Sequence, residues 1–208
     1  MTRAGRALAV LVVMLVGLGA AVWWLGVRNA PEDQAAAVPV AAEEARARGA
    51  YLARAGNCLG CHTVRGGAPY AGGRAIETPF GTVYSSNLTP DAPTGIGHWS
   101  AQDFWRALHH GRSRDGRLLA PAFPYTSTTR ITRADSDALY AWLMSQPPVA
   151  QANREPALHW PFGTQAALAV WRALYFRAGE QTPDPAQSAE WNRGAYLVQA
   201  VAHCDECH

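Results

Sequence analysis

All four cysteines of this 208-residue chain lie in a five-residue pattern, C-x-x-C-H, that occurs twice and restricts the fold more than any other feature. The two copies comprise Cys58, Cys61 and His62, and Cys204, Cys207 and His208. Two thiols on one helical turn can each form a thioether with a vinyl group of a porphyrin, and the adjacent histidine then lies under the iron. The pattern therefore predicts haem c at two places, with the four cysteines as attachment residues and the two histidines as iron ligands.

Three other kinds of cysteine chemistry fit the pattern less well. A thioredoxin-like redox pair also reads C-x-x-C, but it belongs in an alternating strand and helix context that this sequence lacks. Paired zinc motifs usually lie about 12–20 residues apart, whereas Cys58 and Cys204 are 146 positions apart. Disulfides would not explain a histidine after both pairs. Haem attachment is the interpretation that uses every residue of both copies.

The residues before each pattern are duplicated as well. The segment R-G-A-Y-L occurs at 48–52 and again at 193–197. Counted from its alanine, it lies eight residues before Cys58 and nine before Cys204. A duplicated flank indicates a duplicated module. Since the chain ends at His208, we expect the second module to be truncated.

The first 28 residues are predicted to be a membrane anchor or a signal segment. The run from Leu8 to Val27 has no charge and is long enough to cross a bilayer as a helix. Arg3 and Arg6 precede it and would hold that end in the cytoplasm. A cleaved signal with small residues at 19–21 is the alternative to the anchor that we favour. Both interpretations export the rest of the chain. With the anchor that we favour, we expect a bacterial inner membrane protein with its haem domains on the periplasmic side.

Helical patterns dominate the rest of the chain. Apolar periodicity and capping residues predict helices at 41–55, at 100–110 and from 132 to the prolines at 147–148. Residues 63–99 are rich in Gly and Pro and are expected to form a loop around the haem edge, without strands. The predicted class is therefore all-α. The expected order is anchor or signal (1–28), spacer (29–45), first haem domain (46–149), linker with an apolar helix (150–188) and start of a second haem domain (189–208).

The linker has two parts with different expected behaviour. Residues 166–176 are apolar apart from one arginine, and eleven residues are too few to cross a membrane. Such a helix packs on the first module, on a partner subunit or on the membrane face. Residues 180–189 contain two prolines and are expected to be a flexible connection.

Three residues compete for the sixth position of the first iron. A haem that carries electrons usually has Met or His opposite the proximal histidine. Met144 is the one methionine beyond the N-terminal segment and is the candidate, with a core position beside Leu143 as the alternative for it. His109 and His110 are the nitrogen alternatives. If none of the three binds, the iron is open to a small ligand.

Several further stretches are shared with a known family: Gly49–Gly56, Cys58–His62, Thr78–Thr82, Asn87–Asp91, Thr94–Gly97, Pro121–Tyr125, Leu139–Met144 and Trp191–Leu197. In these stretches the chain resembles the multi-haem cytochrome c subunits of bacterial membrane-bound dehydrogenases. The resemblance implies tandem cytochrome c domains, three in family members, that pass electrons from a catalytic dehydrogenase subunit to quinone or another respiratory acceptor. Many relatives have P-A-M-P-Y where this chain has Phe123, and that methionine is their natural sixth ligand.

Composition and side-chain chemistry narrow the function further. The net charge is only +2, which gives no footprint for nucleic acid. No nucleophile–base pair or carboxylate dyad stands out, so we expect an electron-transfer subunit and not an enzyme. Its expected partners are a catalytic dehydrogenase subunit, a quinone or respiratory acceptor and the membrane. The alternative is a ligand-binding or peroxidatic haem protein with an open sixth position, which the phenylalanine at position 123 motivates.

Overall fold

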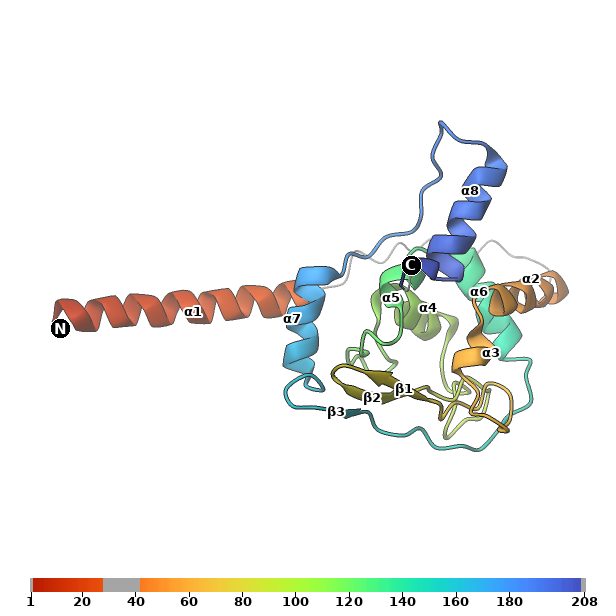
Figure 1. The fold of residues 1–208 in the computed structure, drawn as a ribbon, viewed down its shortest axis with the longest axis horizontal. Coiled ribbons are helices and arrows are strands. Elements are labelled where there is room, and N and C mark those ends of the chain that lie inside the picture. Colours follow the sequence, from red (N-terminus) through yellow and green to blue (C-terminus); the bar gives the residue numbers. More distant parts are fainter. Residues whose placement is uncertain (1, 28–41, 207–208) are drawn as a thin grey trace.

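The computed structural model describes residues 2–27 and 42–206, and Figure 1 shows their arrangement. The predicted spacer lies largely outside the described residues, as do Cys207 and His208. In chain order the elements are α1 (Arg3–Val27), α2 (Ala42–Ala55), α3 (Cys58–Cys61), β1 (Ala75–Thr78), β2 (Gly81–Tyr84), α4 (Ala101–His110), α5 (Tyr125–Thr128), α6 (Arg133–Leu143), β3 (Ala157–Leu158), α7 (Gln165–Tyr175), α8 (Ala189–Tyr196), the π-helix η1 (Leu197–Val201) and the 3₁₀ turn η2 (Cys204–Glu206).

The three helices predicted for the first module are confirmed as α2, α4 and α6. The ends of α4 follow from its sequence. Ser100 and Asp103 form a reciprocal capping box, and Gly111 ends the helix in the left-handed region at φ 57°. Thr132 caps α6 by accepting a hydrogen bond from the Asp135 backbone N–H. Local capping chemistry therefore sets the limits of these helices.

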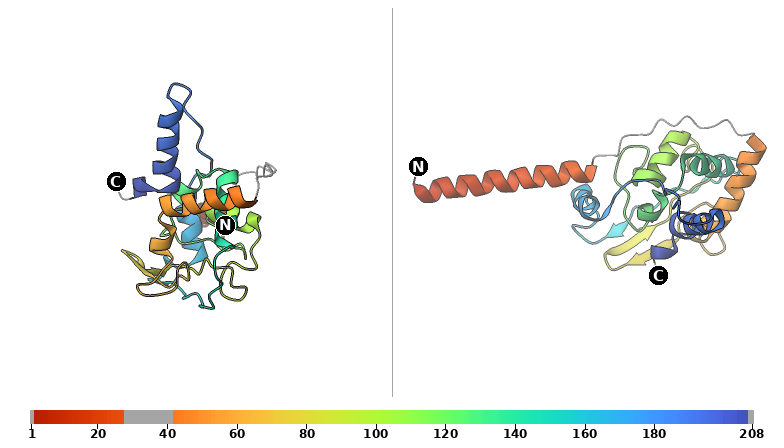
Figure 2. Two further views of the ribbon diagram at one scale, coloured as in Figure 1. Left: turned by 90° about the vertical axis from the view of Figure 1, so that its right-hand side faces the viewer. Right: turned by 90° about the horizontal axis from the view of Figure 1, so that it is seen from above.

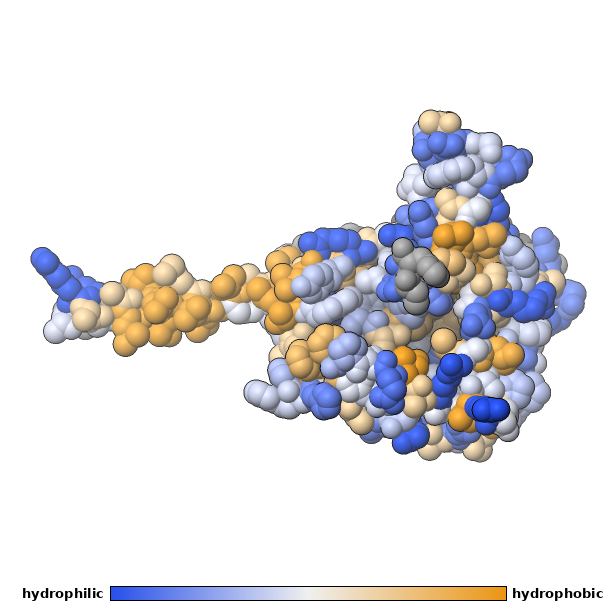
Figure 3. Space-filling model, viewed as in Figure 1, coloured by the Kyte–Doolittle hydropathy of each residue, from blue (hydrophilic) through white to orange (hydrophobic). Residues whose placement is uncertain are grey.

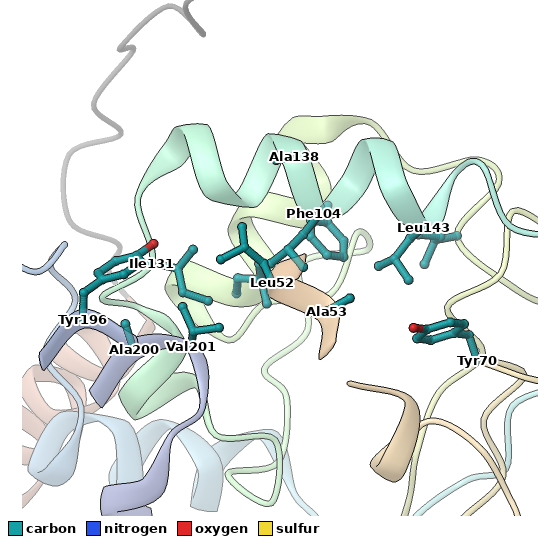
Figure 4. Close-up of a cluster of buried hydrophobic side chains, with 13 residues drawn as sticks. Leu52, Ala53, Tyr70, Phe104, Ile131, Ala138, Leu143, Tyr196, Ala200 and Val201 are labelled. Atoms are coloured by element: carbon teal, nitrogen blue, oxygen red, sulfur yellow. The ribbon is translucent and has the colours of Figure 1, made fainter. Parts of the chain in front are cut away.

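Helices α2 and α6 cross closely because α2 carries a glycine at the crossing point. A Cβ at Gly49 would lie 2.0 Å from the carbonyl oxygen of Ala138, so only glycine allows this approach. The next turn of α2 buries Leu52, which is fully buried, against the same neighbour. Figure 4 shows Leu52 and Phe104, from α2 and α4, meeting beside α6 in one hydrophobic core.

The expectation of a strand-free loop at 63–99 was wrong. Strands β1 and β2 form an antiparallel hairpin, and β3 pairs with β2 to give a three-stranded sheet in the order β1-β2-β3. The hairpin contains Ile76, Val83 and Tyr84, which are residue types that favour strands. Gly81 has φ 114° and lies against the backbone of Ala157, where a Cβ would meet the carbonyl oxygen at 2.4 Å. The part of the chain that the structure describes is thus about half helical with a small three-stranded sheet, so the predicted all-α class is borne out only in part.

Helix α1 is long and apolar enough to cross a membrane, a test that a signal sequence would also pass. It extends from the rest of the molecule as a straight rod (Figures 1 and 2), and its surface in Figure 3 is hydrophobic beyond the polar N-terminal end. Its C-terminal end packs on α7, where Gly26 lies against Ala169 so closely that a Cβ would clash with the carbonyl. The side chain of Arg112 donates to the Val27 carbonyl.

The predicted apolar helix in the linker is confirmed as α7, and a buried arginine joins it to two other helices. Arg172 is 2% exposed and donates from Nε to the Gly26 carbonyl at 2.8 Å and from Nη1 to the His110 carbonyl. Its guanidinium lies over the ring of Phe176 at 4.4 Å. A positive side chain near the C-terminus of a helix stabilises the negative end of the helix dipole. The guanidinium of Arg172 does so for two helices, because it donates to carbonyls in the last turns of α1 and α4.

We predict that R172A destabilises the protein by about 2–4 kcal/mol, because the substitution leaves two buried carbonyls without their donor and removes packing on Phe176. Urea denaturation of the detergent-solubilised chain measures the change. R177A is the matched control, since Arg177 is exposed two residues beyond α7. Equal stability of the two variants would contradict this role for Arg172.

The connection before α8, predicted to be flexible at 180–189, is hydrogen-bonded to the first module where it begins. The backbone N–H of Gly179 donates to Thr129 Oγ1 at 3.1 Å, and that of Gln181 donates to the Arg130 carbonyl at 3.0 Å. The side chain of Glu180 accepts from the backbone N–H of Arg133. These bonds tie the start of the connection to the loop between α5 and α6.

Candidate haem site

The first cysteine pair lies on the single helical turn α3, which begins abruptly after α2. Asn57, between the two helices, has φ 48° and turns the chain in the left-handed region. A Cβ at Gly60 would lie 2.5 Å from the end of the Asn57 side chain, so a larger residue at this position would need Asn57 to move. Cys58 and Cys61 are both free thiols, with Cys58 packed against the hydrophobic core. The turn thus presents two thiols three positions apart, as thioether attachment requires.

The Cys58 thiol lacks the lowered pKa that a reactive or metal-binding cysteine has. Burial raises the pKa of its thiol to about 11, so the thiol keeps its proton at neutral pH. Reactive and metal-binding cysteines have lowered pKa values in electropositive surroundings. Within residues 2–27 and 42–206, no three His, Cys, Asp or Glu side chains gather as a metal site of the zinc type.

His62 is oriented as an iron ligand needs to be. Its Nδ1 lies 2.7 Å from the carbonyl oxygen of Ser86, so the Nδ1–H donates there and Nε2 keeps a free lone pair. Burial lowers the pKa of the ring, which favours the neutral form that binds metals. The His62 carbonyl in turn accepts from the backbone N–H of Gly72 at 2.8 Å. The donor set of two thiols and one oriented imidazole fits haem c.

The loop around the motif is held to it by polar contacts that sequence reasoning missed. Arg74 donates from Nη1 to the Gly60 carbonyl, between the two cysteines. Ser86 binds His62 through its backbone oxygen, which every residue has, so nothing in the sequence indicated this contact. In Figure 3 the surface is hollowed between the segments that Figure 1 labels α3 and α5.

The shared stretch at 87–91 has a structural role. Asn87 is 1% exposed, and its side-chain amide donates to the carbonyls of Val149 at 2.8 Å and Gln151 at 3.2 Å. Its Oδ1 accepts from the backbone N–H and the hydroxyl of Thr89. The asparagine ties the segment after α6 to the loop that carries Ser86, the partner of the proximal histidine.

The candidates for the sixth position lie in different surroundings. Met144 follows α6 and is partly buried against the core beside Leu143. His109 stacks on Trp105 with ring centroids 4.2 Å apart, and His110 meets His109 edge-on at 4.7 Å. Both histidines are thus packed at the end of α4, where Arg172 binds the His110 carbonyl. Phe123 is partly buried against the core, with its ring 6.5 Å from that of Tyr125.

The second motif repeats the local geometry of the first as far as it is described. His203 precedes Cys204 with φ 44°, as Asn57 precedes Cys58 with φ 48°. The extra residue between R-G-A-Y-L and the second motif is absorbed by η1, a π-helical stretch that takes one more residue in its turn. Cys204 is a free thiol that opens η2. The left-handed residue and the cysteine therefore keep the register that the repeat predicts.

Residues 46–147 match the family model described as Cytochrome c. The chain is 55% identical over 161 residues to a nicotinate dehydrogenase subunit of Pseudomonas putida, covering 77% of this chain and 14% of that one. It is 45% identical over 168 residues to the gluconate 2-dehydrogenase cytochrome c subunit of Pantoea cypripedii, covering 77% and 37%. The chain thus spans well under half the length of these two curated relatives.

A third relative matches this chain almost from end to end. The diheme cytochrome c-type protein of Cereibacter sphaeroides is 33% identical over 215 residues, which cover 98% of this chain and 69% of that one. A cytochrome c domain implies covalently bound haem c, and cytochrome c subunits of dehydrogenases imply electron transfer through it. The chain therefore belongs to the cytochrome c family, with cytochrome c subunits of dehydrogenases among its relatives.

Proposed function

We propose that this chain carries electrons through haem c from a membrane-associated dehydrogenase to quinone or another respiratory acceptor. The observation that supports it most is the arrangement of His62, held by Ser86 with Nε2 free, next to two thiols on one turn. Bound haem would supply reversible one-electron chemistry at this place. The chain itself would contribute attachment, orientation and exclusion of water.

Each residue of the first motif has a separate task in this proposal. Cys58 and Cys61 would each supply one thioether sulfur and fix the group on α3. His62 would bind the iron through Nε2, while its bond to Ser86 sets the ring orientation and increases the basicity of the ligand. Arg74 would stiffen the turn by binding the Gly60 carbonyl. By the repeat, Cys204, Cys207 and His208 would perform the same tasks for a second haem.

The proposed setting is the periplasmic side of the bacterial inner membrane. Support comes from α1, which is apolar enough to span a bilayer, and from two exposed tryptophans, Trp23 and Trp24, near its C-terminal end. Aromatic residues of this kind are enriched where a helix leaves the membrane. The dehydrogenase partner is supported by relatives that are named as subunits of nicotinate and gluconate dehydrogenases.

A deletion strain tests the proposed function. We expect its membranes to lose quinone reduction with one of the substrates named for the relatives, such as nicotinate or gluconate, while they still reduce an artificial dye with that substrate. The wild-type gene should restore quinone reduction, and H62A should not, because the iron loses its proximal ligand. Quinone reduction that persists without the gene would refute the relay.

A ligand-binding or peroxidatic haem protein is the second candidate function. It is favoured by the phenylalanine at position 123, where the family resemblance leads us to expect a methionine, and by the core packing of Met144. A visible spectrum with carbon monoxide separates the two functions. Rapid binding of carbon monoxide by the reduced first haem would support the open site, and no binding would support the electron carrier.

A further inference from the structure

The two R-G-A-Y-L segments, far apart in sequence, meet at one buried carboxylate. Asp135 on α6 is 1% exposed. Arg48 of the first segment donates from Nε to its Oδ1, and Tyr196 of the second donates its hydroxyl proton to Oδ2 at 2.7 Å. The Tyr196 oxygen also accepts from the backbone N–H of Thr132 at 3.2 Å. The duplicated segments thus supply one partner each to the same acid.

This arrangement makes the first module depend on the second segment. A buried carboxylate is costly unless its oxygens are hydrogen-bonded. Arg48 satisfies one oxygen of Asp135 from within the first module, and the other oxygen is satisfied by Tyr196 of the second. Figure 4 shows Tyr196, Ala200 and Val201 continuing the core that Leu52 and Ile131 belong to.

The equivalent tyrosines of the two copies are used differently. Tyr196 is 8% exposed, whereas Tyr51 of the first copy is 43% exposed. The guanidinium of Arg193 lies over both rings, 5.7 Å from the centroid of Tyr51 and 5.4 Å from that of Tyr196. A cation over two aromatic faces is a favourable contact. Because only Tyr196 of the two is buried, the hydrogen bond to Asp135 is a feature of the second R-G-A-Y-L segment and not of the first.

The second motif itself contributes further contacts through the two residues that follow Cys204. Asp205 accepts from Arg130 at 3.0 Å, and Glu206 accepts from the hydroxyl of Ser127 at 2.9 Å. Both donors lie on or directly after α5, which follows the loop that carries Phe123. Haem attachment leaves the two residues between the cysteines free to vary. In the second motif these residues are Asp205 and Glu206, and both bind the first module.

We propose that Asp135, Tyr196, Asp205 and Glu206 form an inter-module clamp that gives the second haem-attachment segment a fixed position on the first module. The proposal rests on the proposed electron transfer, because electron transfer between two carriers depends steeply on their separation. The clamp replaces a flexible tether by a rigid contact. Its members are positioning residues, and none of them binds haem.

The test uses the full-length holoprotein and the variant Y196F, which removes one hydroxyl and keeps the ring. We expect amide hydrogen exchange in Leu197–Val201 to accelerate by about tenfold, the scale of one lost buried hydrogen bond. The distance distribution between the two haem irons, measured by pulsed electron paramagnetic resonance, should broaden. Haem content should stay at the wild-type level, which separates a loss of position from a loss of folding.

Matched variants complete the design. Y51F makes the same change in the first copy, where the ring is exposed, and should change neither measurement. D205N/E206Q should broaden the distance distribution, whereas D115N/E155Q removes two charges from exposed positions elsewhere and should not. A narrow, unchanged distribution in both Y196F and D205N/E206Q would overturn the clamp. Neither measurement uses a dehydrogenase or quinone, so a failure of the proposed electron relay would be seen separately.

Discussion

The double variant C58A/C61A is expected to lose one covalently bound haem per chain and to unfold the first module. Both thiols lie on α3, and Cys58 packs against the core that Leu52 and Phe104 form. Removing both sulfurs removes the covalent link and the group that would complete this core. A haem stain on a denaturing gel measures attachment, and urea denaturation measures the stability of the module.

The single variant C204A is the control, since it weakens attachment only at the second motif. It should leave the unfolding of the first module close to that of the wild type. A C58A/C61A variant that keeps its full haem content would show that the first motif is not an attachment site. Zinc in a colourless protein would support the alternative that the cysteine pairs bind metal directly.

The variant F123M is expected to raise the midpoint potential of the first haem by on the order of 0.1 V, within the span of about 0.8 V that axial ligands control. It places a methionine where the resemblance to dehydrogenase cytochrome c subunits implies the sixth ligand. Because a thioether on the iron would compete with carbon monoxide, F123M should also slow the binding of carbon monoxide to the reduced first haem. Redox titration and flash photolysis measure the two effects.

The control for F123M is F80M, the same substitution at an exposed ring that packs on Phe162 and not on the core. F80M should leave the potential unchanged. If F123M also leaves the potential unchanged, position 123 does not reach the iron, and Met144 or one of the histidines on α4 becomes the sixth ligand to examine.

The helices of the first module were predictable because their signals are local. Ser100 with Asp103, and Thr132 with Asp135, lie within one turn of each other, so the sequence contains both members of each cap. The β1–β2 hairpin was missed for the opposite reason. Its strands have four residues each, and its sheet is completed by Ala157 and Leu158, which lie more than seventy positions along the chain.

The sequence by itself determined that this chain has two C-x-x-C-H motifs, each preceded by the same R-G-A-Y-L segment, and that α1 could cross a membrane, because spacing and hydropathy are properties of neighbouring residues. Only the tertiary structure decided which groups serve those motifs. The Ser86 carbonyl that orients His62 has no side-chain signal, and Asp135 looked like an ordinary first-turn acid of α6. Its pairing with both Arg48 and Tyr196 depends on three segments packing together, and no local pattern in the sequence indicates that packing.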